Sequence, residues 1–145
     1  MSATASRRLA TLGVLAAVAA LGGGLLLVRA GASQGGPRTV EVVMHHSHFV
    51  PATLTARPGE TVTFVIRNDD PIDHEFIVGD AAVQARHEVG RERHHHGDVP
   101  GEVSVPAGAE RRTTFRFPGP GSMEFACHLP GHYAYGMHGL VLITK

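Results

Sequence analysis

The sequence predicts an all-β domain, a Greek-key β-sandwich with one short helix, preceded by an apolar N-terminal segment. Three observations lead to this prediction. Apolar and polar residues alternate in several short runs, turn residues separate these runs, and one stretch alone has the composition of a helix. Short alternating strands with turn signals between them are typical of β-sandwiches.

The strand pattern is clearest in residues 61–67, which lie between two pairs of turn residues. Val62, Phe64 and Ile66 occupy alternate positions there, as in a strand with one buried face. The helix is predicted over residues 81–93, because no proline or glycine occurs in them before Gly90 and residues 81–86 all tolerate a helix. Further strands are predicted at 114–117, 122–127 and 140–144.

Residues 1–32 have the pattern of a targeting segment. Arg7 and Arg8 precede 20 uncharged residues at 9–28, and small residues follow at 30–32. This pattern is typical of a secretory signal peptide, and a run of this length can also span a bilayer as a transmembrane anchor. The sequence leaves both alternatives open. Either one predicts an extracytoplasmic protein, in the periplasm or at the cell surface, secreted or membrane-anchored by residues 9–28.

A short Gly-rich linker, residues 33–38, leads into the folded domain at 39–145. The whole chain carries 13 basic and 13 acidic residues and has one cysteine. It has no basic patch of the kind that indicates nucleic-acid binding. A single cysteine cannot form an internal disulfide, so the stability of the domain must come from packing and from a bound metal.

The most informative segment is the run that begins at Cys127. His132 and Met137 follow it at five-residue steps, and Pro130 and Gly131 bend the chain between them. Two imidazoles, one thiolate and a distant thioether are the ligands of electron-transfer copper sites. A buried core thiol is the alternative for a lone cysteine, but the spacing of the histidine and the methionine favours a metal. Such a site requires one more histidine upstream, and the candidate is His74.

From about residue 39 to residue 145 the chain resembles a type 1 (blue) copper protein of the cupredoxin family, similar to plastocyanin, azurin and the small plastocyanin-like copper proteins of bacteria. Beyond the ligand loop, the resemblance includes residues 49–56 and 58–64, and Asn68 before the first ligand loop. It implies one type 1 copper per chain. The implied ligands are His74, Cys127, His132 and Met137.

The resemblance also implies backbone donors near Glu75 and the Asn68 loop that hydrogen-bond the sulfur. For Asn68 itself, a plain turn residue is the alternative.

His132 is expected at the surface, where a redox partner protein would dock and exchange electrons. Its neighbours in the loop are apolar enough to form a docking patch: Leu129, Pro130, Tyr133 and Ala134. Redox partners usually meet through small, weak interfaces. The alternative is that Leu129 and Tyr133 pack beneath the loop.

The chain has 11 histidines, more than one metal site needs. His-rich tracts can bind metal ions, so His94, His95 and His96 are candidates for additional copper, as is the cluster of His45, His46 and His48. A solvated histidine-rich loop is the simpler alternative. His128 and His138 flank ligands and are expected to be surface residues.

Two functions from different classes follow. The first is an exported mononuclear copper protein that carries single electrons through Cu(II)/Cu(I). The alternative is an extracytoplasmic copper-binding protein of copper homeostasis, which sequesters or delivers the metal. An enzyme is not expected. The ligand run also resembles the C-terminal signature of multicopper oxidases, but Ala126 stands before Cys127, where those enzymes have a histidine, and the pair His46 and His48 is too little for a copper cluster.

Overall fold

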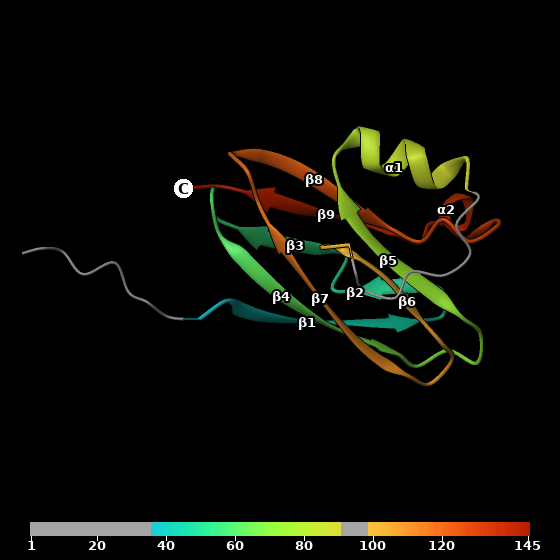
Figure 1. The fold of residues 1–145 in the computed structure, drawn as a ribbon. Helices are drawn as coiled ribbons and strands as arrows, with labels where there is room; N and C mark the ends of the chain where they lie inside the picture. Colours follow the sequence, from blue (N-terminus) through green and yellow to red (C-terminus); the bar gives the residue numbers. More distant parts are fainter. Residues whose placement is uncertain (1–35, 91–98) are drawn as a thin grey trace, which may run out of the picture. The chain divides into compact units, whose positions relative to one another are not determined.

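The computed structural model describes residues 36–90 and 99–145, which form a β-sandwich of two sheets (Figure 1). One sheet has the strand order β2-β1-β4-β7 and the other β3-β9-β8-β5-β6. The strands are β1 (Arg38–His45), β2 (His48–Val50), β3 (Thr53–Ala56), β4 (Thr61–Asn68), β5 (His74–Gly79), β6 (Glu102–Val105), β7 (Glu110–Arg116), β8 (Gly121–Ala126) and β9 (His138–Ile143). Two short helices complete this part of the chain: α1 (Ala81–Glu88) and α2 (His132–Tyr135). The predicted all-β sandwich is confirmed.

The strand order shows a sandwich rather than a simple meander. β1 pairs in parallel with β4, with Val40 opposite Phe64, and β3 pairs in parallel with β9, with Thr53 opposite Leu140. The other pairings are antiparallel. Parallel neighbours require long crossover connections, so strands that are distant in sequence lie side by side.

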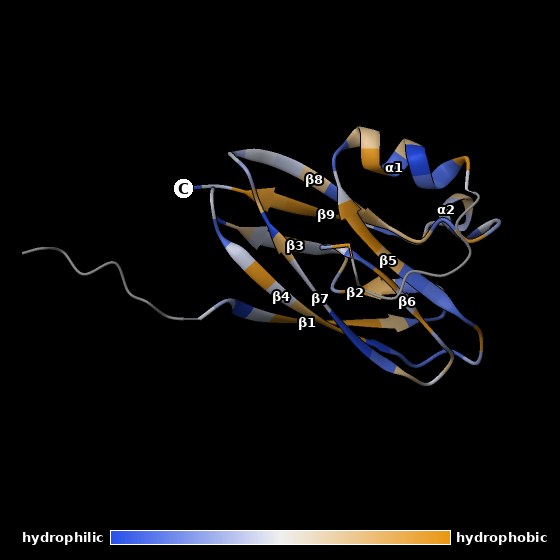
Figure 2. Ribbon diagram, viewed as in Figure 1, coloured by the Kyte–Doolittle hydropathy of each residue, from blue (hydrophilic) through white to orange (hydrophobic). Residues whose placement is uncertain are grey.

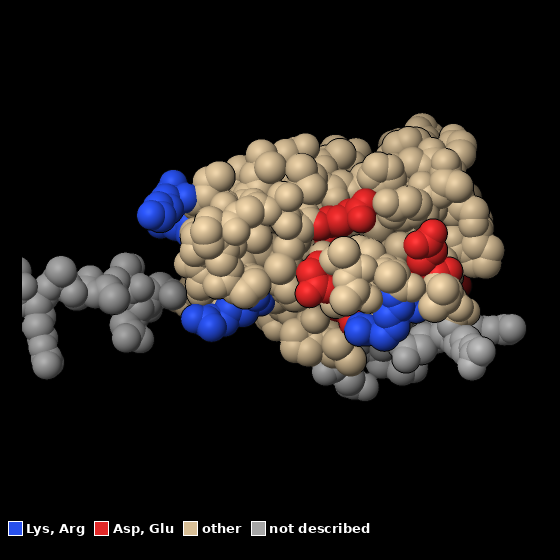
Figure 3. Space-filling view, turned by 90° about the horizontal axis from the view of Figure 1, so that it is seen from above, with Lys and Arg blue, Asp and Glu red and all other residues tan. Residues whose placement is uncertain are grey.

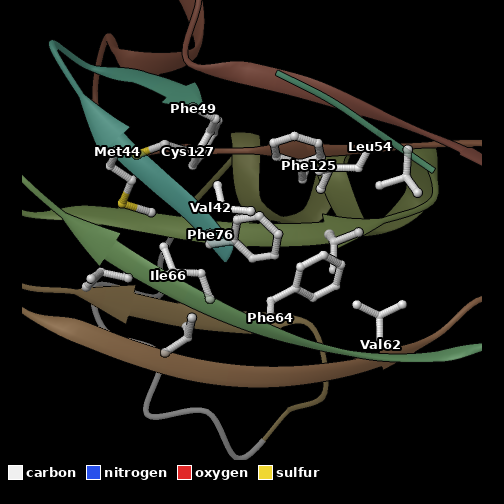
Figure 4. Close-up of a cluster of buried hydrophobic side chains, with 14 of the residues drawn as sticks. Val42, Met44, Phe49, Leu54, Val62, Phe64, Ile66, Phe76, Phe125 and Cys127 are labelled. Carbon is white, nitrogen blue, oxygen red and sulfur yellow. The ribbon is translucent and has the colours of Figure 1, made fainter. Parts of the chain in front are cut away.

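The core lies between the sheets and consists mainly of aromatic and β-branched side chains (Figure 4). The predicted inward face of β4 is confirmed, since Val62, Phe64 and Ile66 are at most 1% exposed, but the alternation is not strict, because Val65 between them is buried as well. Phe49 packs edge-on against Phe76, with ring centroids 5.8 Å apart. Edge-to-face aromatic pairs add about 0.5–1.5 kcal/mol beyond their buried area.

β5 has a different pattern, because all six of its residues are buried. It lies between β8 and β6 in its sheet, and α1 covers its outer side, so neither face meets solvent. In Figure 2 the half of β5 nearer α1 is hydrophobic and the other half is hydrophilic, although all of it is buried.

The helix α1 is shorter than the predicted one. Asp80 caps its N-terminus and accepts hydrogen bonds from the backbone N–H groups of Ala82 and Val83, both at 3.0 Å, as Asp does at N-caps. The helix ends at Glu88, because the glycine at position 90 favours termination. Residues 91–93 of the predicted helix lie outside the described residues.

Strand ends bring the predicted ligands to one end of the sandwich. His74 is the first residue of β5, Cys127 directly follows β8, and Met137 directly precedes β9. His132 is the first residue of α2. The sequence did not predict α2, a single turn between Gly131 and Gly136, both in the left-handed region with φ of 86° and 109°.

Several predicted features lie outside the described residues, namely the signal or anchor at 1–32, the first part of the linker and the tract His94, His95 and His96. The last linker residue, Arg38, belongs to β1. No helix in residues 36–90 or 99–145 is long and apolar enough to cross a membrane. On the face shown in Figure 3, acidic and basic side chains are scattered among uncharged residues.

Candidate metal centre

Three of the four predicted ligands converge. His74 Nδ1 lies 3.1 Å from His132 Nδ1, which lies 3.3 Å from Cys127 Sγ. All three donor atoms lie within 4.8 Å of one another, and this is the only group of three or more such His, Cys, Asp or Glu donors in the described part of the chain. His74 is 1% exposed and Cys127 is fully buried, while His132 is half-buried.

Met137, the fourth predicted ligand, lies in the same buried cluster as Cys127. The backbone N–H of Cys127 donates to the Met137 carbonyl at 3.1 Å, and the N–H of Met137 donates to the His132 carbonyl at 3.0 Å. These two bonds fold the loop back on itself, so that residues ten apart in sequence become neighbours. The predicted role of Pro130 and Gly131 in bending the loop agrees with this course.

The donor set fits copper. Thiolate favours Cu(I), whereas imidazole suits copper in general, and the site offers one cysteine and two histidines. Burial raises the pKa of the Cys127 thiol to about 12, although hydrogen bonds from the backbone N–H groups of Glu75 and Leu129 oppose this shift. A metal that binds the sulfur must therefore displace a proton. Burial, and then the neighbouring His74, lower the pKa of His132, which favours the neutral imidazole that a metal needs.

A carboxylate orients the first histidine. His74 Nε2 lies 2.8 Å from Asp70 Oδ2, and an N–H on that nitrogen leaves the lone pair of Nδ1 directed at the site. Ligand histidines commonly donate their second ring N–H to a carboxylate in this way. The sequence analysis missed Asp70. The signal that could have indicated its role is a carboxylate four residues before a predicted ligand histidine.

Asp70 is itself held by the turn between β1 and β2. It accepts the backbone N–H groups of His46 at 2.6 Å and of Ser47 at 2.7 Å. Both turn residues have positive φ, 53° and 55°, and successive N–H groups in such a turn form an anion-binding concavity. Burial acts to raise the pKa of Asp70, but the hydrogen bonds from Ser47, His74 and His46 outweigh it and hold that pKa below its usual value.

Glu75 forms hydrogen bonds with Cys127 and with the residue that follows it. Its backbone N–H lies 3.4 Å from Cys127 Sγ, and its Oε1 accepts the backbone N–H of His128 at 2.8 Å. The expected backbone donor to the sulfur near Glu75 is therefore present.

Asn68 acts differently from the expectation. Its Nδ2 donates to the carbonyls of Ile72 at 2.8 Å and Val105 at 2.9 Å, and its Oδ1 accepts the N–H of Asp70 at 3.0 Å. Its hydrogen bonds thus hold the loop that carries Asp70, and none of those found goes to the sulfur.

The expectation that His128 is a surface residue is wrong. The side chain is half-buried, and its Nε2 lies 2.7 Å from Gln84 Oε1 in α1. Burial, and then the neighbouring His87, lower the pKa of His128. His138 is exposed as expected. The sequence gives no signal for the burial of His128, because α1 covers it from a distant part of the chain.

The loop around His132 is largely exposed. Pro130 and Ala134 are exposed and Tyr133 is 37% exposed, whereas Leu129 is half-buried and packs against the core. The docking patch expected there stays a prediction. The histidines of the β1–β2 turn, His45, His46 and His48, are exposed.

Comparison with known proteins agrees with this geometry. The family model described as "Cupredoxin-like domain" matches residues 15–142. The chain is 43% identical to the copper-resistant cuproprotein CopI of Rubrivivax gelatinosus, over 79% of this chain and 72% of that protein. It is 31% identical to the protein of the same name from Pseudomonas aeruginosa, over 73% of this chain and 76% of that one.

Among solved structures, the fold is similar to that of auracyanin A, a "blue" copper protein from Chloroflexus aurantiacus. The TM-score is 0.58 at 25% sequence identity, and the match covers 75% of this chain and 100% of that one. The family match spans most of the sequence, and the two curated relatives are matched over more than two thirds of their length. The chain therefore belongs to the cupredoxin-like domain family.

Proposed function

We propose that this protein is an extracytoplasmic copper-binding protein of copper resistance. It takes up one copper ion at His74, Cys127, His132 and Met137. The observation that carries the proposal is the convergence of two imidazole nitrogens and one thiol sulfur within 4.8 Å at a buried position. Copper bound there would be held by ligands that suit both of its oxidation states.

The names of the relatives favour resistance over electron transport, the role that the sequence analysis placed first. Both are called copper-resistant cuproproteins. In this role copper is the cargo, which the protein sequesters or delivers. Residues 1–32 would export the domain, as a cleaved signal or as an anchor formed by residues 9–28.

Electron transport is the second candidate, and the closed character of the site favours it. His74 and Cys127 are almost completely buried, and Asp70 and Glu75 hold them in place from outside the ligand set. A site in which two ligands, His74 and Cys127, are fixed at strand ends changes little between oxidation states. A redox partner would then dock near His132, the most exposed of the three converging ligands. In both roles the protein binds copper without catalysing a reaction.

Growth in copper tests the first function. A strain that lacks the protein should grow poorly in elevated copper, and the natural sequence should restore growth. Cys127→Ser should fail to restore it. If the strain lacking the protein tolerates copper normally, resistance is excluded.

Stopped-flow reduction of the copper-loaded protein tests the second function. Electron transport predicts fast, reversible reduction at one copper per chain. Delivery instead predicts transfer of the metal itself to an acceptor, which a copper count on both proteins after mixing detects.

A further inference from the structure

Each of the three C-terminal ligands is followed in the sequence by an aromatic or imidazole ring. His128 follows Cys127, Tyr133 follows His132, and His138 follows Met137. In the structure these three rings stack on one another. The rings of His128 and Tyr133 are 5.3 Å apart and nearly parallel, at 9°, and those of Tyr133 and His138 are 5.0 Å apart at 26°.

The stack continues into the helix α1. The ring of His128 lies 6.1 Å from that of His87, at 26°, and His87 is only 5% exposed. The buried His87 ring is fixed at both nitrogens, with Nδ1 2.9 Å from the Val83 carbonyl and Nε2 3.1 Å from Glu102 Oε2. We call the four stacked residues the ring column: His87, His128, Tyr133 and His138.

The outer part of the column also contacts β8. The hydroxyl of Tyr133 donates to Glu124 Oε1 at 2.9 Å, and His138 Nδ1 lies 3.6 Å from the same oxygen. The column therefore connects α1, the loop after β8, α2 and β9. Three of its four residues directly follow a predicted ligand in the sequence.

The helix α2 needs such support, because its own interactions are weak. It has only four residues, none of them is buried, and no side chain caps its N-terminus. A single turn of this kind is not stable by itself in water. Yet α2 carries His132, whose position decides whether the three donor atoms meet. Apart from backbone hydrogen bonds and the contacts of the ligand His132 itself, Tyr133 attaches α2 to His128, to β8 and to β9.

We propose that the ring column holds residues 127–138 in the metal-binding geometry before copper arrives, with Tyr133 as its central positioning residue. This inference rests on the proposed copper-binding function and adds a set of side chains that order the loop before the metal binds. A loop that is already ordered loses less conformational entropy when the metal binds. The column thus raises copper affinity without contributing a ligand.

Two substitutions at Tyr133 and one control test the proposal on the full chain purified in detergent. Tyr133→Leu removes the ring, Tyr133→Phe keeps the ring and removes the hydroxyl, and Tyr135→Leu is the matched control. Tyr135 belongs to the same turn of helix, is 67% exposed, and contacts His48 instead of the column.

Copper affinity, measured by competition with a chelator, should fall at least about tenfold in Tyr133→Leu, the loss typical when groups that support metal ligands are removed. It should stay within about twofold of the natural protein in Tyr133→Phe, since an exposed hydrogen bond contributes little. Tyr135→Leu should match the natural protein. In copper-loaded Tyr133→Leu, the electron paramagnetic resonance lines should broaden, because the ligands occupy a wider range of positions.

Amide hydrogen exchange on the copper-free protein gives a second readout that does not depend on metal. In Tyr133→Leu the amides of His132, Tyr135 and Met137 should exchange at least about tenfold faster, while those of β4 keep their rates. Equal exchange and equal affinity in the two leucine variants would overturn the proposal. Because the exchange measurement needs no copper, it still decides the role of the column if the protein proves to have no part in resistance.

Discussion

Asp70 lies between a ligand and a turn: its Oδ2 is 2.8 Å from His74 Nε2, and its two carboxylate oxygens accept the N–H groups of His46 and Ser47. One carboxylate thereby fixes both the ring of His74 and the conformation of the β1–β2 turn. The position of a ligand on β5 is thus linked to a segment nearly thirty residues earlier in the chain.

Asp70→Asn should weaken both copper binding and the fold. The amide has one acceptor oxygen in place of two, so at least one of the donors that the carboxylate now accepts loses its partner, at a cost of about 1 kcal/mol or more. Copper affinity should fall about 10–100-fold, because His74 loses the group that orients it. Urea unfolding of the copper-free protein and chelator competition measure the two effects. Asp69→Asn is the control, since Asp69 is exposed and its carboxylate lies 3.2 Å from the guanidinium of Arg67.

Cys127→Ser should abolish the visible thiolate-to-copper absorption and most copper binding, because a hydroxyl is a poor ligand for Cu(I). The triple substitution of His94, His95 and His96 by alanine should leave the absorption intact. It should lower the copper count per chain only if that tract binds additional metal. Absorption spectra and metal analysis of both variants check this. A bleached triple variant would show that the ligands are assigned wrongly.

Gly139→Ala should destabilise the domain by about 3 kcal/mol or more, since overpacking of a tight site is costly. A Cβ at position 139 would clash with the ring of Phe125 and lie 2.6 Å from the Ala52 carbonyl oxygen. Chemical denaturation measures the loss. Gly119→Ala is the control, because its Cβ would meet nothing within 4 Å, and it should change stability by less than about 0.5 kcal/mol.

Glu60 should make the domain sensitive to acid. The side-chain hydrogen bond from Arg38, at 2.7 Å, and the backbone N–H of Arg57 hold the pKa of Glu60 below 4.5 against the opposing effect of burial. A carboxyl whose pKa is lower in the folded state stabilises the fold above its unfolded-state pKa, and this contribution is lost as the pH falls through the folded-state value. Glu60→Gln should therefore show a smaller loss of stability between pH 6 and about pH 3 than the natural protein.

Urea unfolding at the two pH values tests this prediction. Glu41→Gln, a substitution of an exposed residue on β1, is the control. If all three proteins lose the same stability, the contact between Glu60 and Arg38 has no role in acid sensitivity.

The strands and the ligand loop could be predicted because their signals are local. The alternation of Val62, Phe64 and Ile66 requires only the period of a strand, and the steps from Cys127 to Met137 fit one bent loop. The helix boundary at Glu88 differed from the prediction by five residues, because a glycine two positions beyond ends the helix and composition alone marks such ends poorly.

The surroundings of the ligands could not be predicted, since they depend on pairing between distant segments. Nothing near His128 in the sequence indicates that Gln84 and His87 cover it. Asp70 accepts hydrogen bonds from backbone N–H groups of the β1–β2 turn. Every residue except proline has such a group, so the residue types in the turn do not indicate these contacts. The turn α2 is too short to produce a periodic pattern, and its position depends on the stack at Tyr133.

The order of the strands determines when the site can exist. β8 pairs with β5, placing Ala126 opposite Ile77, and with β9, placing Ala126 opposite His138. β5 and β8 are far apart in sequence, and joining such segments is slow, because a long loop must close first. The four predicted ligands can therefore meet only after β9 has paired with β8, because Met137 directly precedes β9.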